Sequence, residues 1–291
     1  MKYIDIDLIN IQVKENKNAL IRQTENNYNS EIEHLARKAI VNRFAMPIML
    51  ISGPSGSGKT TTANLIKHNM SRLGYKATVV SLDNYFLPTS GENLPRRDDG
   101  ELDLESPLRV DIPLFKEHLQ KMEHGIPIQM PVFDFKTQRV SEYVPFKREQ
   151  ESVVIIEGIH TLNPMLTEEI REQALCVYVS VRTRVKSGDT LLHPSYIRLM
   201  RRLVRDFKNR GRTFEHTVQM FESVNDGEKM HILPYKKYAD VDIDTFMEYE
   251  ICVYGELLKR FRLREFGEFL EKAEDVRVED VPSNSLVREF I

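Results

Sequence analysis

The chain of 291 residues contains only two cysteines, Cys176 and Cys252, which stand far apart inside apolar stretches. A disulfide framework or a cysteine metal site needs more cysteines at closer spacing. We therefore expect two reduced thiols in the core of a protein that works in a reducing compartment.

Long apolar runs are also absent. No stretch of about 18 apolar residues occurs, and the N-terminus carries acids where a signal peptide needs basic and then apolar residues. With 41 basic and 44 acidic residues the net charge is −3, which gives no strong overall field for nucleic acid or a membrane. The composition predicts a soluble cytoplasmic protein without nucleic-acid or membrane partners.

An unbroken phosphate-binding motif, Gly-Pro-Ser-Gly-Ser-Gly-Lys-Thr, occupies residues 53–60, directly after the apolar run 47–52. Its glycines let the backbone turn and aim N–H groups at phosphate oxygens, and the following helix adds its positive end. In such loops the lysine reaches the β- and γ-phosphates, and the next hydroxyl binds Mg²⁺. Lys59 is thus also a catalytic candidate, and Thr60 a magnesium ligand. The residues expected to bind a nucleoside triphosphate are Gly53, Ser55, Gly56, Ser57, Gly58, Lys59, Thr60 and Thr61.

Short apolar runs alternate with helical patterns along the chain. The runs at 48–52, 77–82, 153–157, 175–181 and 241–243 predict strands that are buried on both faces. Helices are expected near 59–73, 111–124, 164–173 and 195–210, and the Pro-punctuated stretch at 126–150 predicts a β-hairpin lying off the sheet. The pattern indicates a three-layer α/β/α P-loop domain with a parallel sheet.

We expect two parts in the chain, an N-terminal extension at 1–45 and the P-loop domain at 46–291. Residues 1–29 are polar and rich in asparagine after a short alternating segment, which predicts a small strand and a loose connection. A helix is expected from Ser30, a good capping residue, to Arg43.

Two acidic residues follow predicted strands, at the edge where parallel sheets bind ligands. A carboxylate at Asp83 is placed to orient and deprotonate an attacking hydroxyl, although a turn cap is the structural alternative. Glu157 ends four apolar residues, where burial without a charged partner would be costly, so we predict that it serves a magnesium ion. A single histidine near a strand end, such as His160, is more often structural than catalytic.

Basic side chains concentrate at 182–212, among only two acidic ones. Four of them recur at i, i+3, i+4 and i+7 and would stack on one helix face, namely Arg198, Arg201, Arg202 and Arg205. Such charges repel unless an anion lies between them, and a helix break at Gly211 fits a lid that closes over transferring phosphates. A solvated face and RNA binding are the alternatives, but few aromatic residues for base stacking are interleaved here.

Together these motifs resemble the uridine kinase and phosphoribulokinase family of P-loop kinases, and within it the bacterial uridine kinase-like nucleoside kinases. The likeness extends over roughly residues 47–245. Besides the phosphate loop, the matching segments are 81–86, 104–107, 131–135, 157–159, 198–206 and 210–212.

The resemblance implies that the γ-phosphoryl group of ATP is transferred, with Mg²⁺, to the 5′-hydroxyl of a nucleoside, uridine- or cytidine-like. By that likeness Asp83 would be the general base and Glu105 would hold ribose hydroxyls. Arg202 and Arg212 would face the acceptor, with Arg202 also catalytic, whereas Arg205 and Arg210 would face ATP. The residues expected to bind the acceptor are Asp83, Tyr85, Glu105, Phe133, Gln138, Arg202 and Arg212.

The hairpin departs from the family pattern, with Phe133 in place of a tyrosine and Gln138 in place of a histidine. Selectivity built on polar contacts changes when those contacts are missing, so the nucleobase stays open. A kinase of another small hydroxylated acceptor, such as a sugar phosphate or a pantothenate-like molecule, is the first alternative. A nucleotide-binding regulator or RNA-binding ATPase is the second, although no Asn-Lys-x-Asp guanine motif is present. The oligomeric state stays open, a homo-oligomer included.

Overall fold

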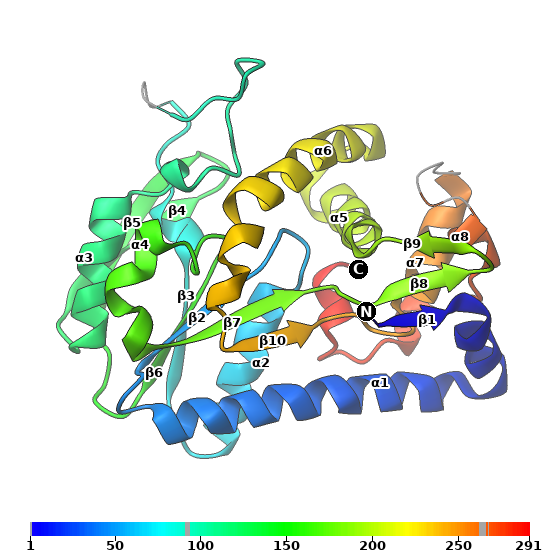
Figure 1. The fold of residues 1–291 in the computed structure, drawn as a ribbon, viewed down its shortest axis with the longest axis horizontal. Helices are drawn as coiled ribbons and strands as arrows, with labels where there is room; N and C mark the ends of the chain where they lie inside the picture. Colours follow the sequence, from blue (N-terminus) through cyan, green and yellow to red (C-terminus); the bar gives the residue numbers. More distant parts are fainter. Residues whose placement is uncertain (1, 91–93, 262–265, 267) are drawn as a thin grey trace.

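The computed structural model describes residues 2–90, 94–261, 266 and 268–291. Its centre is a five-stranded sheet with the order β10-β7-β2-β6-β3 (Figure 1). These strands are β2 (Ile48–Ser52), β3 (Ala77–Ser81), β6 (Val153–Glu157), β7 (Ala174–Ser180) and β10 (Val241–Asp244). Every neighbouring pair among them is parallel, so the parallel sheet expected from the five apolar runs is confirmed.

Alternate side chains of β2, β6 and β7 enter two different hydrophobic clusters, because successive residues of a strand point to opposite faces. On β2, Met49 and Ile51 belong to one cluster, whereas Ile48 and Leu50 belong to the other. The first cluster includes side chains from α1 (Ile6–Asn42), α2 (Lys59–Arg72), α5 (Pro194–Arg210), α6 (Phe214–His231), α7 (Glu250–Leu258) and α8 (Glu268–Lys272). The second includes α3 (Ile112–Glu123) and α4 (Pro164–Thr167). Helices therefore cover both faces, and the expected α/β P-loop fold class is confirmed.

The loose connection predicted before residue 29 is wrong, because helix α1 begins at Ile6 and runs under the sheet to Asn42 (Figure 1). Asp5 rather than Ser30 is its N-cap. Asn16 interrupts the helix with φ −160° and ψ 78°, and its side chain accepts a hydrogen bond from the N–H of Ala19 at 3.0 Å, so it starts a second helical segment. The apolar side chains recur at helical spacing on the buried face, although polar asparagines between them hide the pattern.

A second sheet joins the N-terminus to the start of the basic segment. Its strands are β1 (Tyr3–Asp5), β8 (Arg184–Ser187) and β9 (Thr190–Leu192), with β1 parallel to β8. Arg184 and Lys186 lie on β8, and Arg182 is paired with Asp242 at 3.3 Å. The lid expected from the basic segment therefore does not include these three residues.

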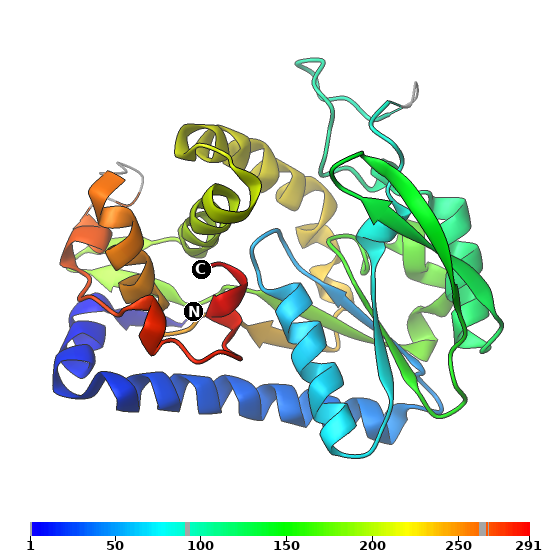
Figure 2. The same cartoon turned by 180° about the vertical axis from the view of Figure 1, so that it is seen from behind.

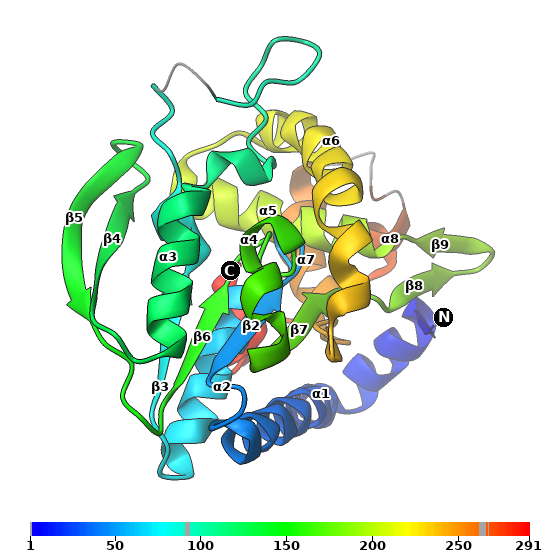
Figure 3. The ribbon, with the colours of Figure 1, turned by 60° about the vertical axis from the view of Figure 1, so that its left-hand side comes forward.

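The expected hairpin is confirmed as a separate two-stranded antiparallel sheet of β4 (Ile128–Asp134) and β5 (Arg139–Phe146). It stands outside the main sheet next to α3 (Figure 3). The N–H of Phe133 donates to the Asn84 side chain at 3.3 Å, which fixes the hairpin beside the residue that follows Asp83.

The expected helices at 59–73, 111–124 and 195–210 are confirmed as α2, α3 and α5, and Gly211 ends α5 in a left-handed conformation. The helix expected at 164–173 is α4 followed by a 3-10 helix, Glu168–Gln173. Helices α6, α7 and α8 were not predicted. Both cysteines are buried free thiols, as expected. Among the described residues, no helix is both long and apolar enough to cross a membrane.

A buried hydrogen-bond chain connects the N-terminal helix with the C-terminal segment. The hydroxyl of Tyr249, which is fully buried, donates to Glu25 of α1 at 2.5 Å and lies 2.8 Å from the Ser285 hydroxyl. A buried carboxylate that loses its donor carries an uncompensated desolvation cost.

Replacing the tyrosine by Tyr249→Phe is therefore expected to lower the free energy of unfolding by about 1–3 kcal/mol. Urea denaturation followed by circular dichroism measures the change. The control is Tyr3→Phe at an exposed position, with an expected change within about 0.5 kcal/mol. Equal stability of the two variants would contradict the prediction.

Candidate active site

The phosphate loop, Asp83 and Glu157 follow three neighbouring strands of the sheet. The loop comes after β2, Glu157 is the last residue of β6, and Asp83 lies in the 3-10 helix Leu82–Tyr85 just after β3. Because β2, β6 and β3 are adjacent and parallel, their carboxyl ends deliver these residues to one edge of the sheet.

Two glycines of the loop are required by its geometry. A Cβ atom at Gly53 would lie 1.9 Å from the carbonyl oxygen of Val179, which no side chain tolerates. Gly58 is the N-cap of α2 in a left-handed conformation with φ 87°, a region that favours glycine.

The carbonyl oxygens of three consecutive loop residues are bound from outside the loop. Arg198 donates to Ser55 at 3.1 Å, Arg201 to Gly56 at 3.1 Å, and Thr245 to Ser57 at 2.7 Å. The C=O and N–H of a trans peptide point in opposite directions, so the N–H groups of Gly56 and Gly58 face the other side of the loop. The outer contacts thus aim donors toward the place where an anion binds such a loop.

Arg201 is committed to a fully buried ion pair with Glu250, and both side chains have 0% exposure. The two guanidinium–carboxylate hydrogen bonds measure 2.8 and 2.9 Å, and Arg201 also donates to the carbonyl of Thr245 at 2.6 Å. Burial acts to lower the pKa of Arg201, but the charge and hydrogen bonds of Glu250, together with Tyr254 and Glu289, outweigh it and the pKa is raised. The expected stripe of four lid arginines therefore includes two residues, Arg198 and Arg201, that anchor the loop.

Removal of the negative charge by Glu250→Gln leaves Arg201 buried without a counter-ion, and the expected loss of unfolding free energy is about 3–5 kcal/mol. Thermal and urea unfolding measure it. Glu256→Gln, an exposed position on the same helix, is the matched control and should change little. A variant as stable as the wild type would contradict this role for the pair.

Four other arginines of the basic segment surround Asp206, whose side chain is completely buried, whereas Arg198 is paired with Glu228. Nitrogen–oxygen distances to this carboxylate are 2.9 Å from Arg205, 3.4 Å from Arg210, 3.5 Å from Arg212 and 3.9 Å from Arg202. One carboxylate cannot neutralise four guanidinium groups, so the cluster keeps an excess of positive charge. Sequence spacing identified the arginines, but not Asp206 as the residue that gathers them.

Asp83 lies within electrostatic reach of the loop and of the arginine cluster. Burial raises the pKa of its carboxyl to about 6, and the charge of Glu157 adds to the rise. Lys59 and Arg210 oppose it. The site therefore brings the carboxylates of Asp83 and Glu157 close to each other and to the charges of Lys59 and Arg210.

Glu105 belongs to the same electrostatic group. Burial raises its pKa to about 7, against the effect of Arg202 and Lys59. Helix α6 packs directly against Glu105, since a Cβ atom added at Gly227 would lie only 2.3 Å from the Cβ of Glu105. His160 is buried nearby, and burial followed by the charge of His231 lowers its pKa to about 3, so its ring is neutral.

In the loop and the first turn of α2, Lys59 donates to the carbonyl of Pro54 at 3.3 Å, and Thr60 is exposed. The hydroxyl of Thr61 donates to Glu289, a residue that sequence analysis did not single out. Ser55 accepts a hydrogen bond from Arg202 at 2.5 Å. These expected nucleotide-binding residues are therefore gathered around one end of α2.

The expected acceptor residues on the hairpin side are arranged less uniformly. Phe133 packs against Phe135, with ring centroids 5.3 Å apart, and the side chain of Gln138 donates to the Phe135 carbonyl at 2.7 Å. Tyr85 does not join them: it is 1% exposed in the core, with its hydroxyl 3.1 Å from Nδ1 of His118.

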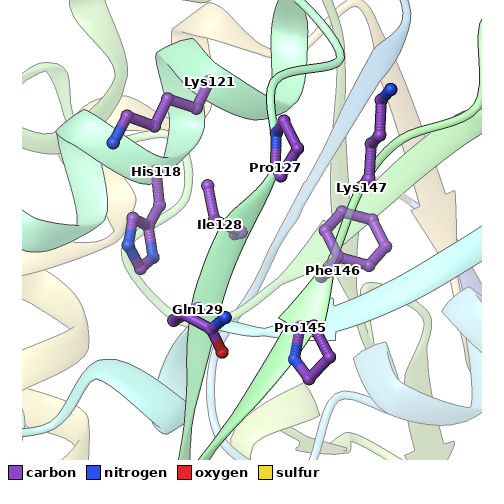
Figure 4. Close-up of a pocket in the computed structure, with 8 residues that line it drawn as sticks. All are labelled: His118, Lys121, Pro127, Ile128, Gln129, Pro145, Phe146 and Lys147. Carbon is purple, nitrogen blue, oxygen red and sulfur yellow. The ribbon is translucent and has the colours of Figure 1, made fainter.

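A separate cavity of about 490 Å³ lies between α3 and the hairpin (Figure 4). Its lining is His118, Lys121, Pro127, Ile128, Gln129, Pro145, Phe146 and Lys147. It includes none of the expected site residues, and no carboxylate lies among its lining. The cavity is therefore separate from the group of loop, carboxylate and arginine residues at the sheet edge.

Within the described part of the chain, no group of three or more His, Cys, Asp or Glu side chains is arranged to hold a metal. The Asp83 and Glu157 carboxylates and the exposed Thr60 hydroxyl are nevertheless oxygen donors of the kind that Mg²⁺ takes. Magnesium commonly binds one or two carboxylates together with substrate phosphates, so the donor set fits an ion that arrives with a nucleotide.

A phosphate loop between a central parallel strand and a helix, with an arginine-rich helix packed against it, defines the class as a P-loop kinase. The sequence pattern of the Phosphoribulokinase / Uridine kinase family matches residues 48–251, and the chain belongs to this family.

Curated relatives agree with this membership. Uridine kinase of Lactobacillus helveticus (strain DPC 4571) is 29% identical over 216 residues, which cover 74% of this chain and 94% of the relative. Uridine kinase of Anoxybacillus flavithermus (strain DSM 21510 / WK1) is 33% identical over 201 residues, which cover 68% of this chain and 85% of the relative. Among solved structures, a protein described as a fructose transport system kinase from Silicibacter sp. TM1040 has a TM-score of 0.52 at 19% identity, covering 73% of this chain and 98% of its own. At 19% identity, the likeness to this structure shows a shared fold alone.

Proposed function

We propose that the protein is an ATP-dependent kinase that transfers the γ-phosphoryl group to the 5′-hydroxyl of a nucleoside, uridine- or cytidine-like. The observation that carries the proposal is the position of Asp83 at the sheet edge, within electrostatic reach of Lys59 and Arg210. The relatives named uridine kinase support the choice of acceptor.

The donor triphosphate is bound by the inward N–H groups of Gly56 and Gly58 and by the Lys59 ammonium group. Mg²⁺ held by Thr60 and Glu157 would neutralise phosphate charge when it is bound. Because Lys59 rests on the Pro54 carbonyl at a long 3.3 Å, little is lost when it turns to the phosphates.

Asp83 acts as general base on the acceptor hydroxyl. It takes the proton while the hydroxyl oxygen forms a bond to the γ-phosphorus, and the bond from that phosphorus to the β–γ bridging oxygen breaks to release ADP. Arg202, Arg205, Arg210 and Arg212 supply positive charge to the transferring group, because Asp206 neutralises only part of theirs. Glu105 holds the hydroxyls of the acceptor sugar.

The neutral variant Asp83→Asn tests the base. We expect kcat to fall at least about 100-fold, because general base catalysis contributes on that order, with ATP affinity little changed. Coupled ADP release and calorimetry measure the two quantities. Asp189→Asn, at an exposed turn between β8 and β9, is the control, and full activity of Asp83→Asn would reject the assignment.

The raised pKa of Asp83 predicts an acid limb in the pH profile. The base form is lost as pH falls through about 6, and not near the ordinary value of 3.8, so kcat/KM for the acceptor should decline below about pH 6. Initial rates between pH 5 and 8 check this. The decline below about pH 6 should persist in Glu105→Gln, because we assign it to Asp83 and not to Glu105. A profile that stays flat down to pH 5 would contradict the prediction.

A second candidate is a kinase of another small hydroxylated acceptor, such as a sugar phosphate or a pantothenate-like molecule. It is favoured by the hairpin, where Phe133 has no polar group and the Gln138 amide is bound within its own turn. A panel of nucleosides, sugar phosphates and pantothenate with ATP and Mg²⁺, followed by ADP release, decides between the two. No turnover with any nucleoside would reject the first proposal.

A further inference from the structure

The C-terminal segment of the chain lies against the nucleotide-binding end of α2. The 3-10 helix Leu286–Glu289 contacts α2, and Figure 2 shows this red segment beside the loop that leads into the helix. The Leu286 side chain fills the space in front of Gly58, where a Cβ atom would lie 2.7 Å from its Cδ1. The segment is thus packed onto the phosphate loop itself.

The carboxylate of Glu289 binds the first turn of α2. Its Oε2 accepts a hydrogen bond from the Thr61 hydroxyl at 2.5 Å and lies 3.4 Å from the Thr61 backbone nitrogen. The N-cap of this helix, Gly58, has no side chain to satisfy these donors. A carboxylate from more than 200 positions away in the sequence therefore supplies the anion at the positive end of the helix.

The same donors suit a phosphate. Backbone N–H groups at the start of a helix bind phosphate oxygens, and those of a P-loop surround the phosphates nearest the nucleoside, whereas the lysine reaches further along the chain of phosphates. A carboxylate and a phosphate oxygen compete for such a position because both are anionic acceptors.

We propose that Glu289 occupies the position of an α-phosphate oxygen, so that the C-terminal segment competes with the donor nucleotide and sets its affinity. This inference rests on the proposed function, because it assumes a nucleotide in the loop. The Glu289 side chain leaves Thr61 when the donor binds.

The competition is local, because the segment around Glu289 stays attached to the core. The Ser285 hydroxyl lies 2.8 Å from that of Tyr249, and the Phe290 ring packs on the guanidinium of Arg201, 5.0 Å from the ring centroid. A change of the Glu289 side chain, or of the single turn that carries it, frees the two donors of Thr61 without unfolding the segment.

Calorimetric titration with ATP, without acceptor, tests the proposal on the wild type, Glu289→Gln and the control Glu279→Gln, an exposed glutamate in the preceding 3-10 helix, Val278–Asp280. Loss of the competing charge should tighten ATP binding by about tenfold in Glu289→Gln and leave Glu279→Gln unchanged. Adenosine, which carries no phosphate, should bind the wild type and Glu289→Gln equally.

Hydrogen exchange of the wild type gives an independent readout that needs no variant. Because the Glu289 side chain leaves while the segment stays attached, amides at 285–290 should exchange no more slowly when ATP is bound than without it. Equal ATP affinity of wild type and Glu289→Gln, weaker binding by Glu289→Gln, or slower exchange at 285–290 each overturns the competition alone. If the wild type, Glu289→Gln and Glu279→Gln are all folded but none of them binds ATP, both the proposed function and this inference are rejected.

Discussion

The buried pair of Arg201 and Glu250 is the interaction on which the site depends. The guanidinium group holds the Gly56 carbonyl and the Thr245 backbone at once, so it connects the phosphate loop, helix α5 and the end of β10. Because a charge without its partner is costly in a dry interior, the pair favours one arrangement of these elements. The direction of the loop N–H groups is therefore set from outside the nucleotide site.

Much of the fold was predictable because local sequence and local structure agree in the sheet. Five short continuous apolar runs that alternate with helical patterns are typical of strands with helices on both faces, and Asp83 and Glu157 stand where such strands end. The arginine periodicity was also informative, but it could not separate Arg201, which is fully buried, from Arg210, which lies near Asp83. Spacing shows which residues share a helix face, but not which partner a distant segment supplies.

The residues missed by sequence analysis are those whose roles arise from long-range contacts. Glu250 and Glu289 stand in apolar or mixed surroundings, and only the fold brings them next to Arg201 and Thr61. A buried acid among apolar neighbours was a usable signal at Glu157 and was equally present at Glu250. Helix α1 was missed because asparagine is common in loops, although Asn16 here serves as an internal cap.

The strand order places the phosphate loop and Asp83 under different structural constraints. The phosphate loop follows the central strand β2, whereas Asp83 follows β3, the edge strand of the described sheet. The β4–β5 hairpin forms no backbone ladder with that sheet and contacts the 3-10 helix that carries Asp83. The hairpin is nevertheless tied to the core by Ile128, which is buried in the same hydrophobic cluster as Ile48 and Leu50. Strand β5, by contrast, consists mostly of exposed positions. Substitutions on β5 are therefore expected to disturb the fold less than changes in β2, whose five residues are all buried and which leads into the phosphate loop.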